Sequence, residues 1–228
     1  MIDVRFGVKV ESVSESDSGA LTTVTDVDTG ARKIISSKYV GACDGASSKV
    51  RTSLSIPLDG GPTPGFVLLV HFKSTDLSRI RKQGQFWHLF FLVGGHMGGA
   101  LIAQNEIDTW TVHMFLPLDA DPDKIDSHEA VYTVLGGLGE KYRITIDEIL
   151  VRSTFRPNVA VARSYISPKG HAYLAGDSAH QNIPTGGYGM NMGIADAWDL
   201  GWKVCCPNLH FFSILSHTSI SSIIRVWP

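Results

Sequence analysis

Apolar and polar residues alternate at the start of the chain in the two-residue period of a β-strand with one buried face. The alternating apolar residues are Val4, Phe6, Val8 and Val10. Further strands are expected over residues 21–27 and 34–35, because turn-forming sequences at 17–19 and 28–30 precede them. A short apolar run at 39–42 follows. The tight turns leave no room for helices, so the pattern predicts a meander of three strands.

Runs of apolar residues predict a β-rich middle and later section with few helices. The expected strands cover residues 66–70, 86–93, 98–104, 109–116, 149–155 and 172–175. The turn at 105–108 joins two of them as a hairpin. Helices are expected over 77–82 and 127–138, the second opened by Ser127 with Glu129 in its first turn. The chain is therefore expected to mix α and β elements.

Composition is typical of a globular protein. The chain has 228 residues, of which 43% are hydrophobic and 18% charged. A net charge of −2 gives no electrostatic case for a nucleic-acid or anionic-membrane partner. No apolar run has the roughly 18 residues of a membrane span, and no secretory signal opens the chain, so a soluble, cytoplasmic protein is expected. The three cysteines lack metal-ligand spacing, and no metal is expected.

Residues 172–191 carry the most informative chemistry. A predicted strand stops at Gly176-Asp177, and a glycine-rich loop then leads into a helix. A carboxylate at a strand end can accept hydrogen bonds from vicinal hydroxyls, such as those of a ribityl chain. Glycines let the backbone approach a flat ligand, and a helix start directs unpaired N–H groups towards it. The residues of this loop and helix start are Pro184, Gly186, Gly187, Gly189, Met190 and Asn191.

A second predicted strand ends at Asp44-Gly45, and the residues that follow predict a short helix. Ser47 or Ser48 can cap the first turn of this helix. Arg51 supplies a fixed positive charge beside the turn. Taken alone, such a turn before a helix is weak evidence for a binding site.

Together the two segments resemble the class A flavoprotein monooxygenases, the FAD-dependent aromatic hydroxylases similar to para-hydroxybenzoate hydroxylase. Residues 176–180, 186–191 and 196–203 resemble that family's Gly-Asp segment, and residues 40–51 resemble its Asp-Gly segment. The resemblance spans almost all of residues 1–203. It implies an α/β (mixed α+β) fold, in which a partial FAD-binding Rossmann-like domain carries an inserted mixed β-sheet substrate domain.

The implied domains are an FAD-binding domain at residues 1–56 and 158–203 and a substrate-binding β-rich domain at 57–157. An aberrant tail is expected at 204–228. The family begins with a strand, a Gly-x-Gly-x-x-Gly turn and a helix that bind the ADP half of FAD. That pattern is absent, since the glycine cluster at 94–99 has a different spacing. A form truncated at both ends is therefore expected.

The resemblance assigns FAD contacts residue by residue. Asp177 would bind the ribityl chain, and Pro184 would lie by the flavin edge. Asp44 and Gly45 would lie near the pyrophosphate, with Arg51 behind them. Backbone contacts to the pyrimidine ring would come from Gly187, Gly189, Met190 and Asn191.

In this family FAD and the co-substrate NAD(P)H supply the redox chemistry, and molecular oxygen supplies the hydroxyl group placed on an aromatic ring. The implied function is therefore an FAD-dependent, NAD(P)H-using monooxygenase of a phenolic or polyketide-like aromatic substrate. The alternative is a non-catalytic fragment or pseudoenzyme of the family that does not retain FAD.

The sequence names no catalytic residue. His88 and His113 fall on predicted strands facing the implied substrate side, where either can take a phenolic proton. Hydrogen-bonded core or surface histidines are the more frequent case. His180 is expected to brace its loop, and Asp196 and Asp199 to lie on a helix face, pairing with a lysine at position 203.

Overall fold

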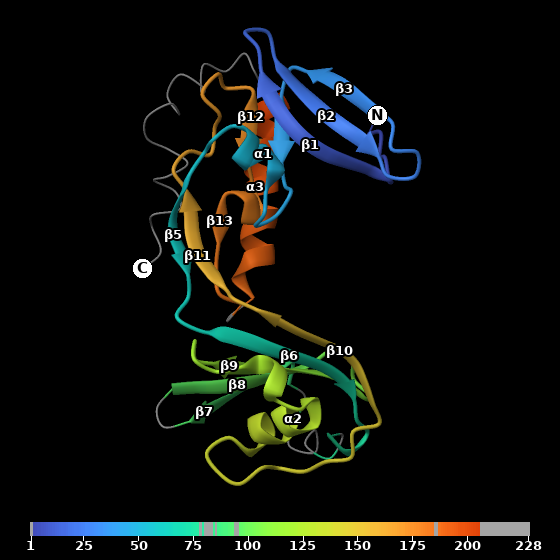
Figure 1. The fold of residues 1–228 in the computed structure, drawn as a ribbon, viewed down its shortest axis with the longest axis vertical. Coiled ribbons are helices and arrows are strands. Elements are labelled where there is room, and N and C mark those ends of the chain that lie inside the picture. The colour runs from blue at the N-terminus through green and yellow to red at the C-terminus, as the bar shows by residue number, and fades with distance from the viewer. Residues whose placement is uncertain are drawn as a thin grey trace. The chain divides into compact units, whose positions relative to one another are not determined.

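The computed structural model describes residues 2–77, 79, 84, 86–93, 96–184 and 187–205. The chain forms two compact units (Figure 1). The first contains residues up to Gly61 and again from Asn158, and the second is Pro62–Pro157. Each unit buries an apolar cluster of its own, as independently packed parts of a chain do.

The first unit opens with the expected meander. Its antiparallel strands, in the order β1-β2-β3, are β1 (Val8–Glu15), β2 (Ala20–Asp26) and β3 (Arg32–Ser37). The expected start of the first strand is wrong, because Val4 and Phe6 precede β1 and are 67% and 91% exposed. The pairing register shifts between Val10 and Ser12, which reverses the alternation, so that Val13 is buried.

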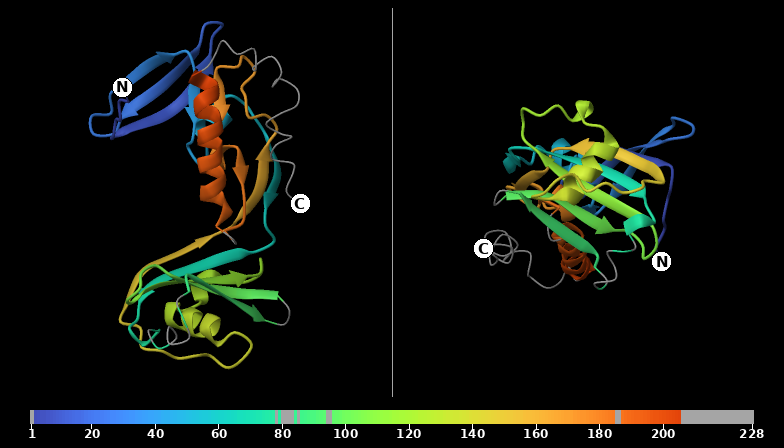
Figure 2. Two further views of the ribbon diagram at one scale, coloured as in Figure 1. Left: turned by 180° about the vertical axis from the view of Figure 1, so that it is seen from behind. Right: turned by 90° about the horizontal axis from the view of Figure 1, so that it is seen from below.

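Two small sheets and one long helix complete the first unit. One sheet pairs β4 (Val40–Ala42) with β12 (Ala172–Leu174) in parallel, and the other has the order β13-β11-β5. The other elements are α1 (Lys49–Ser53), β5 (Leu58–Pro62), β11 (Asn158–Ala162), a single 3-10 turn (Gly176–Ser178), β13 (His180–Gln181) and α3 (Tyr188–Cys205). Figure 2 shows α3 as one continuous helix.

The second unit is a five-stranded sheet with one helix. The strands are β6 (Phe66–Lys73), β7 (His88–Val93), β8 (His96–Ala103), β9 (Thr109–Leu116) and β10 (Glu148–Phe155). Their order is β10-β6-β9-β8-β7, with antiparallel pairing at all four junctions. The mixed sheet that we expected is therefore antiparallel in its described strands. The parallel pairing, β4 with β12, occurs in the first unit.

One face of this sheet packs on α2 (Ser127–Gly136) to form the core. Trp110 is fully buried there, and its Nε1 donates to Ser74 O over 3.0 Å. The helix begins at Ser127 as predicted, but its cap is Asp126, whose Oδ1 accepts from the backbone N–H groups of His128 and Glu129.

Two predicted segments fall largely outside the described residues. These are the helix at 77–82 and the tail at 204–228. Only the first two residues of the tail are described. Within the described part of the chain, no helix is long and apolar enough to cross a membrane.

Candidate functional site

A buried serine fixes the Gly176-Asp177 turn to the end of β4. Ala175 N donates to Ala42 O over 3.0 Å. Ser178 is fully buried, and its hydroxyl donates to the same carbonyl over 2.6 Å. Gly176 has a φ of +61°, a left-handed conformation that favours glycine. These contacts hold Asp177 in a defined place at the strand end.

Asp177 lies beside the first turn of α3. A Cβ added at Gly189 would lie 3.9 Å from Asp177 Oδ1, and one added at Gly176 would lie 3.7 Å from Gly193 Cα. Both distances are ordinary van der Waals contacts, so the turn and the helix are packed side by side. The sequence pattern predicts a carboxylate next to a glycine-lined helix start, and the structure brings these two features together.

The loop before α3 holds the other predicted flavin contacts. Pro184 is exposed, and Gly187 has a φ of +65° with open space where a Cβ would be. Asn191 Nδ2 donates to Gly187 O over 3.1 Å, which fixes the loop to the helix. Met190 is exposed on the first turn, whereas Gly186 lies outside the described residues. These residues gather at the helix start, and their contacts with a ligand stay a prediction.

Asp44 uses its carboxylate to cap α1. Its Oδ2 accepts from Lys49 N at 2.7 Å and from Val50 N at 3.1 Å. Of the two serines expected as caps, Ser48 has this role, since its hydroxyl accepts from Arg51 N at 2.9 Å. The first turn of this short helix is thus fully capped from within the chain.

Gly45 and Arg51 complete the Asp44-Gly45 turn. Gly45 has a φ of +79°, and a Cβ there would meet no atom within 4 Å. The guanidinium of Arg51 donates to Ile56 O at 3.3 Å and to Ala46 O at 3.5 Å. Its Nε is buried without a partner among the described residues. The positive charge of Arg51 therefore lies beside the turn, and its role towards a ligand stays a prediction.

The two turns are neighbours because β4 and β12 are paired parallel strands whose last residues, Ala42 and Leu174, lie opposite each other. Ligands of α/β sheets bind beyond such carboxyl ends. Gln181 connects the turns, since its Nε2 donates to Ala46 O at 3.0 Å and to Asp177 O at 3.4 Å. Gln181 could not be predicted as a site residue from the sequence, because a lone glutamine has no characteristic spacing.

His180 and Asp196 join the turn to α3. His180 is 2% exposed, and its Nε2 donates to Asp196 Oδ2 over 2.6 Å, so it braces the loop as expected. Asp196 also accepts from Gly176 N at 2.7 Å, which corrects its expected role as a simple helix-face residue. Burial alone would raise the pKa of Asp196. The hydrogen bonds from His180 and Gly176 outweigh burial, so the pKa of Asp196 is lowered. The predicted pair of Asp199 with Lys203 is present.

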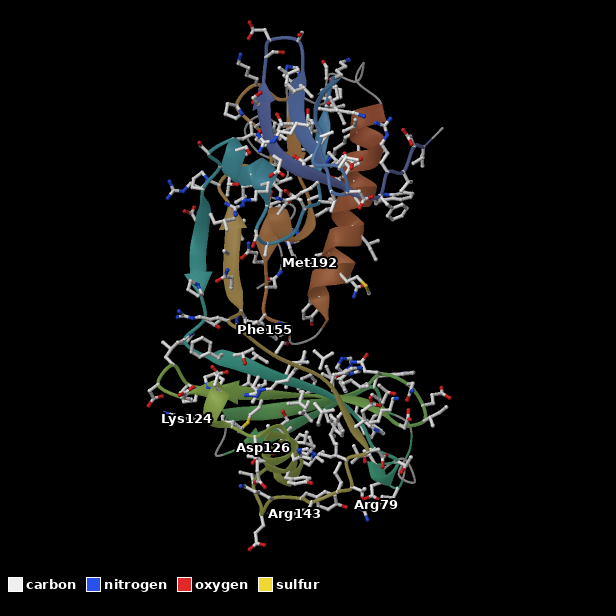
Figure 3. The ribbon with its side chains drawn as sticks, turned by 45° about the vertical axis from the view of Figure 1, so that its right-hand side comes forward. Arg79, Lys124, Asp126, Arg143, Phe155 and Met192 are labelled. Carbon is white, nitrogen blue, oxygen red and sulfur yellow. The ribbon has the colours of Figure 1, made fainter. Side chains whose placement is uncertain are left out.

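In the second unit, the sheet face away from α2 carries polar and aromatic side chains. The register places His71 opposite Thr111, and His71 Nδ1 lies 2.8 Å from Thr111 Oγ1. Gln104 Nε2 donates to the same hydroxyl at 3.0 Å. Figure 3 labels Phe155 on this face and Asp126 at the start of α2. Polar side chains therefore lie on this face beside apolar ones such as Val67, which pairs with Phe155.

His88 and His113 both lie on this face of the sheet, which is called the open face below, and its role in covering a substrate stays a prediction. The ring of His88 stacks near Phe90, with centroids 6.2 Å apart, and that of His113 meets Phe155 edge-on at 6.4 Å. Burial, followed by the charge of His88, lowers the pKa of His113. The imidazole of His113 is therefore predominantly neutral near pH 7 and can accept a proton. The described residues hold no cluster of three or more metal-ligating side chains.

The fold and these turns are those expected of a flavin-binding class of protein, and the comparisons show the family. Residues 1–208 match the model of the FAD binding domain family FAD_binding_3, and the chain belongs to this family. The expected resemblance to FAD-dependent aromatic hydroxylases is confirmed.

Several relatives are monooxygenases by name. An FAD-dependent monooxygenase of Emericella nidulans (apdD) is 55% identical over 209 residues, which are 90% of this chain and 34% of that protein. A second, from Penicillium oxalicum (opdD), is 51% identical over 90% of this chain and 40% of that protein. A putative polyketide hydroxylase of Streptomyces coelicolor is 31% identical over 89% of this chain and 32% of that protein. The chain thus spans 40% or less of the length of these relatives.

Solved structures give the same fold. The flavin-dependent monooxygenase PieE, in complex with FAD and substrate, is 29% identical with a TM-score of 0.72, over 89% of this chain and 35% of that one. Native and K252c-bound RebC-10x has 28% identity and a TM-score of 0.72, over 88% of this chain and 38% of that one. The expected α/β fold class is confirmed.

The residues present fit FAD, the cofactor that the family implies. Gly45 and Gly187 have positive φ and open space where a side chain would be, so each turn leaves its backbone open to a flat ligand. Arg51 Nε and Gln181 Oε1 are buried polar atoms with no partner among the described residues. Hydrogen-bonding capacity therefore remains where the two turns meet.

Proposed function

We propose that this chain is the flavin-contacting and substrate-covering part of an FAD-dependent, NAD(P)H-using monooxygenase that hydroxylates a phenolic or polyketide-like aromatic compound. One observation carries the proposal. The carboxylate of Asp177 lies beside the glycine-lined start of α3, and the Asp44-Gly45 turn follows the neighbouring parallel strand. A helix start suits the electron-rich edge of a flavin ring, and a strand-end carboxylate suits the hydroxyls of its ribityl chain.

The residues of the first unit have distinct binding roles in this proposal. Asp177 accepts hydrogen bonds from the ribityl hydroxyls, and the N–H groups at the start of α3 face the electron-rich edge of the flavin. Arg51 sits behind the Asp44-Gly45 turn, where it offers positive charge to the pyrophosphate. Bound FAD, reduced by NAD(P)H, supplies the redox and oxygen chemistry.

The open face of the five-stranded sheet is the proposed surface for the aromatic substrate. Phe90 and Phe155 are 44% and 37% exposed there, which offers ring contacts. His71, held through Thr111, presents its second ring nitrogen for a polar substituent. His113 is a candidate to accept the phenolic proton, because its lowered pKa keeps it neutral. The names of the relatives, among them a polyketide hydroxylase, support this class of substrate.

A titration of the purified chain with FAD, followed by flavin fluorescence and visible absorption, tests the proposal. We expect saturable binding, and a loss of roughly tenfold or more in affinity for Asp177→Ala, because charge-assisted hydrogen bonds are lost. Asp17→Ala is the matched control, since the Asp17 side chain is 98% exposed and pairs with Lys169 at the surface.

The catalytic half of the proposal is tested with NAD(P)H, oxygen and a panel of phenols and aromatic polyketides. The expected result is consumption of NAD(P)H with a product heavier by one oxygen atom. If the chain shows no saturable change with FAD, or if Asp177→Ala binds FAD as the parent does, the proposal fails. A chain that folds but retains no FAD would instead support the non-catalytic alternative.

A further inference from the structure

Gln181 is the one side chain among the described residues that donates hydrogen bonds to both turns. It is 5% exposed, and its Nε2 donates to Ala46 O at 3.0 Å and to Asp177 O at 3.4 Å. Ala46 follows the Asp44-Gly45 turn, and it lies 135 residues from Gln181 in the sequence. A primary amide offers two N–H groups in one plane, which matches two carbonyl acceptors.

The backbone around Gln181 is held in place by contacts that do not involve the Gln181 side chain. Gln181 lies on β13, opposite Ala160 of β11. The adjacent His180 is held by Asp196 of α3 through a 2.6 Å hydrogen bond. The amide therefore reaches the two carbonyls from a strand that is anchored on both sides, as a pre-organised contact requires.

Ala46 O receives a second donor from the other side of the turn. Arg51 Nη2 lies 3.5 Å from the same oxygen, so Arg51 and Gln181 converge on one carbonyl. Gln181 Oε1 and Arg51 Nε are both buried without a partner among the described residues. An apolar side chain of similar size would avoid leaving such an atom unpaired. A glutamine at this position is therefore poorly explained by packing alone.

We propose that Gln181 is a positioning residue that holds the Asp44-Gly45 turn and the Gly176-Asp177 turn at a fixed spacing, so that both can contact one FAD. The inference rests on the proposed function, in which the two turns bind the same cofactor. Gln181 acts through the two backbone carbonyls. Its loss therefore weakens FAD binding by letting the turns separate, while each turn keeps its own internal hydrogen bonds.

The test compares Gln181→Met and Gln181→Glu with the parent chain. Methionine keeps the length and removes the donors, and we expect FAD affinity to fall roughly tenfold, the scale of one or two neutral hydrogen bonds. Glutamate places acceptor oxygens against two carbonyl oxygens, and a larger loss is expected. Tyr173→Phe is the control, because it removes one hydroxyl donor to Gly170 O from a buried residue of the same unit.

Hydrogen exchange of backbone amides gives a readout that needs no flavin. In Gln181→Met we expect faster exchange at residues 44–48 and 176–178 together, with other amides unchanged. A role in stability alone would lower the melting temperature in Gln181→Met and Tyr173→Phe alike and leave FAD affinity unchanged in both, which would overturn the inference.

Two outcomes separate this inference from the proposed function. If the parent chain binds no FAD, the proposed function fails. If the parent binds FAD and Gln181→Met binds it equally well, only the positioning role fails. Should Gln181→Met not fold, the side-chain amide signals of Gln181 in the parent are followed by NMR during FAD addition. We expect these signals to be slow in exchange and to shift, whereas rapidly exchanging, unshifted signals would contradict the inference.

Discussion

His180 Nε2 lies 2.6 Å from Asp196 Oδ2, and the same carboxylate oxygen accepts from Gly176 N at 2.7 Å. One side chain of α3 therefore fixes both ends of the segment between β12 and β13. The segment contains Asp177, so the orientation of the proposed ribityl contact depends on a residue twenty positions along the chain from Gly176. The pair links the stability of this unit to the geometry of its candidate site.

Asp196→Ala is expected to destabilise the protein by about 3–5 kcal/mol, because it leaves the buried His180 and the amide of Gly176 without their acceptor. Urea unfolding followed by circular dichroism measures the change. Asp17→Ala is the control, since exposed ion pairs contribute only about 0–1 kcal/mol. Equal losses of unfolding free energy in the two variants would show that the Asp196 contacts stabilise the protein no more than an exposed ion pair does.

The same pair predicts a loss of stability in acid. The pKa of Asp196 is lower in the folded protein than in the unfolded chain. Its contribution is therefore fully present above the ordinary carboxyl pKa, and it is lost as the pH falls through the lowered folded value. Asp196→Asn should show a shallower loss of stability between about pH 5 and pH 3 than the parent does. Melting temperatures across this range test the prediction, and parallel curves would contradict it.

A glycine in β5 predicts a local packing effect. Gly60 has a φ of +105°, and a Cβ there would lie 2.1 Å from Val159 O, which is a backbone atom that cannot move aside easily. Gly60→Ala should therefore cost about 2–3 kcal/mol or more. Gly61 is the matched control, because a Cβ there meets nothing within 4 Å. We expect Gly61→Ala to change the free energy of unfolding by less than about 1 kcal/mol, and a similar cost for both would be inconsistent with this packing.

Elements with regular patterns and clear turns were predictable from the sequence. The run 109–116 forms β9, as its apolar residues and the turn before it predicted. The start of β1 was not predictable, since the shift between Val10 and Ser12 depends on pairing with β2. β5, with the sequence Leu-Asp-Gly-Gly-Pro, has a turn-like composition, and only its pairing beside β11 makes it a strand.

The candidate site also has a part that could be predicted from the sequence and a part that could not. The two turns could be found from local sequence, because glycine and aspartate at a strand end carry a recognisable spacing. The contacts that join the turns could not be found, since Gln181 and Asp196 act over 135 and 20 residues of sequence. Hydrogen bonds of this kind depend on tertiary packing, and no local sequence pattern predicts them.

The lowered pKa of His113 has two causes that an experiment can separate. Burial is the larger cause, and the charge of nearby His88 adds to it. Titration of the histidine ring protons by NMR should place the His113 midpoint below the ordinary value of about 6.5. In His88→Asn the midpoint should rise but stay below that value, because burial remains. His128→Asn on α2, whose side chain is 48% exposed, should leave the midpoint unchanged. A His113 midpoint at or above 6.5 in the parent would remove the reason to consider this residue as a neutral proton acceptor near pH 7.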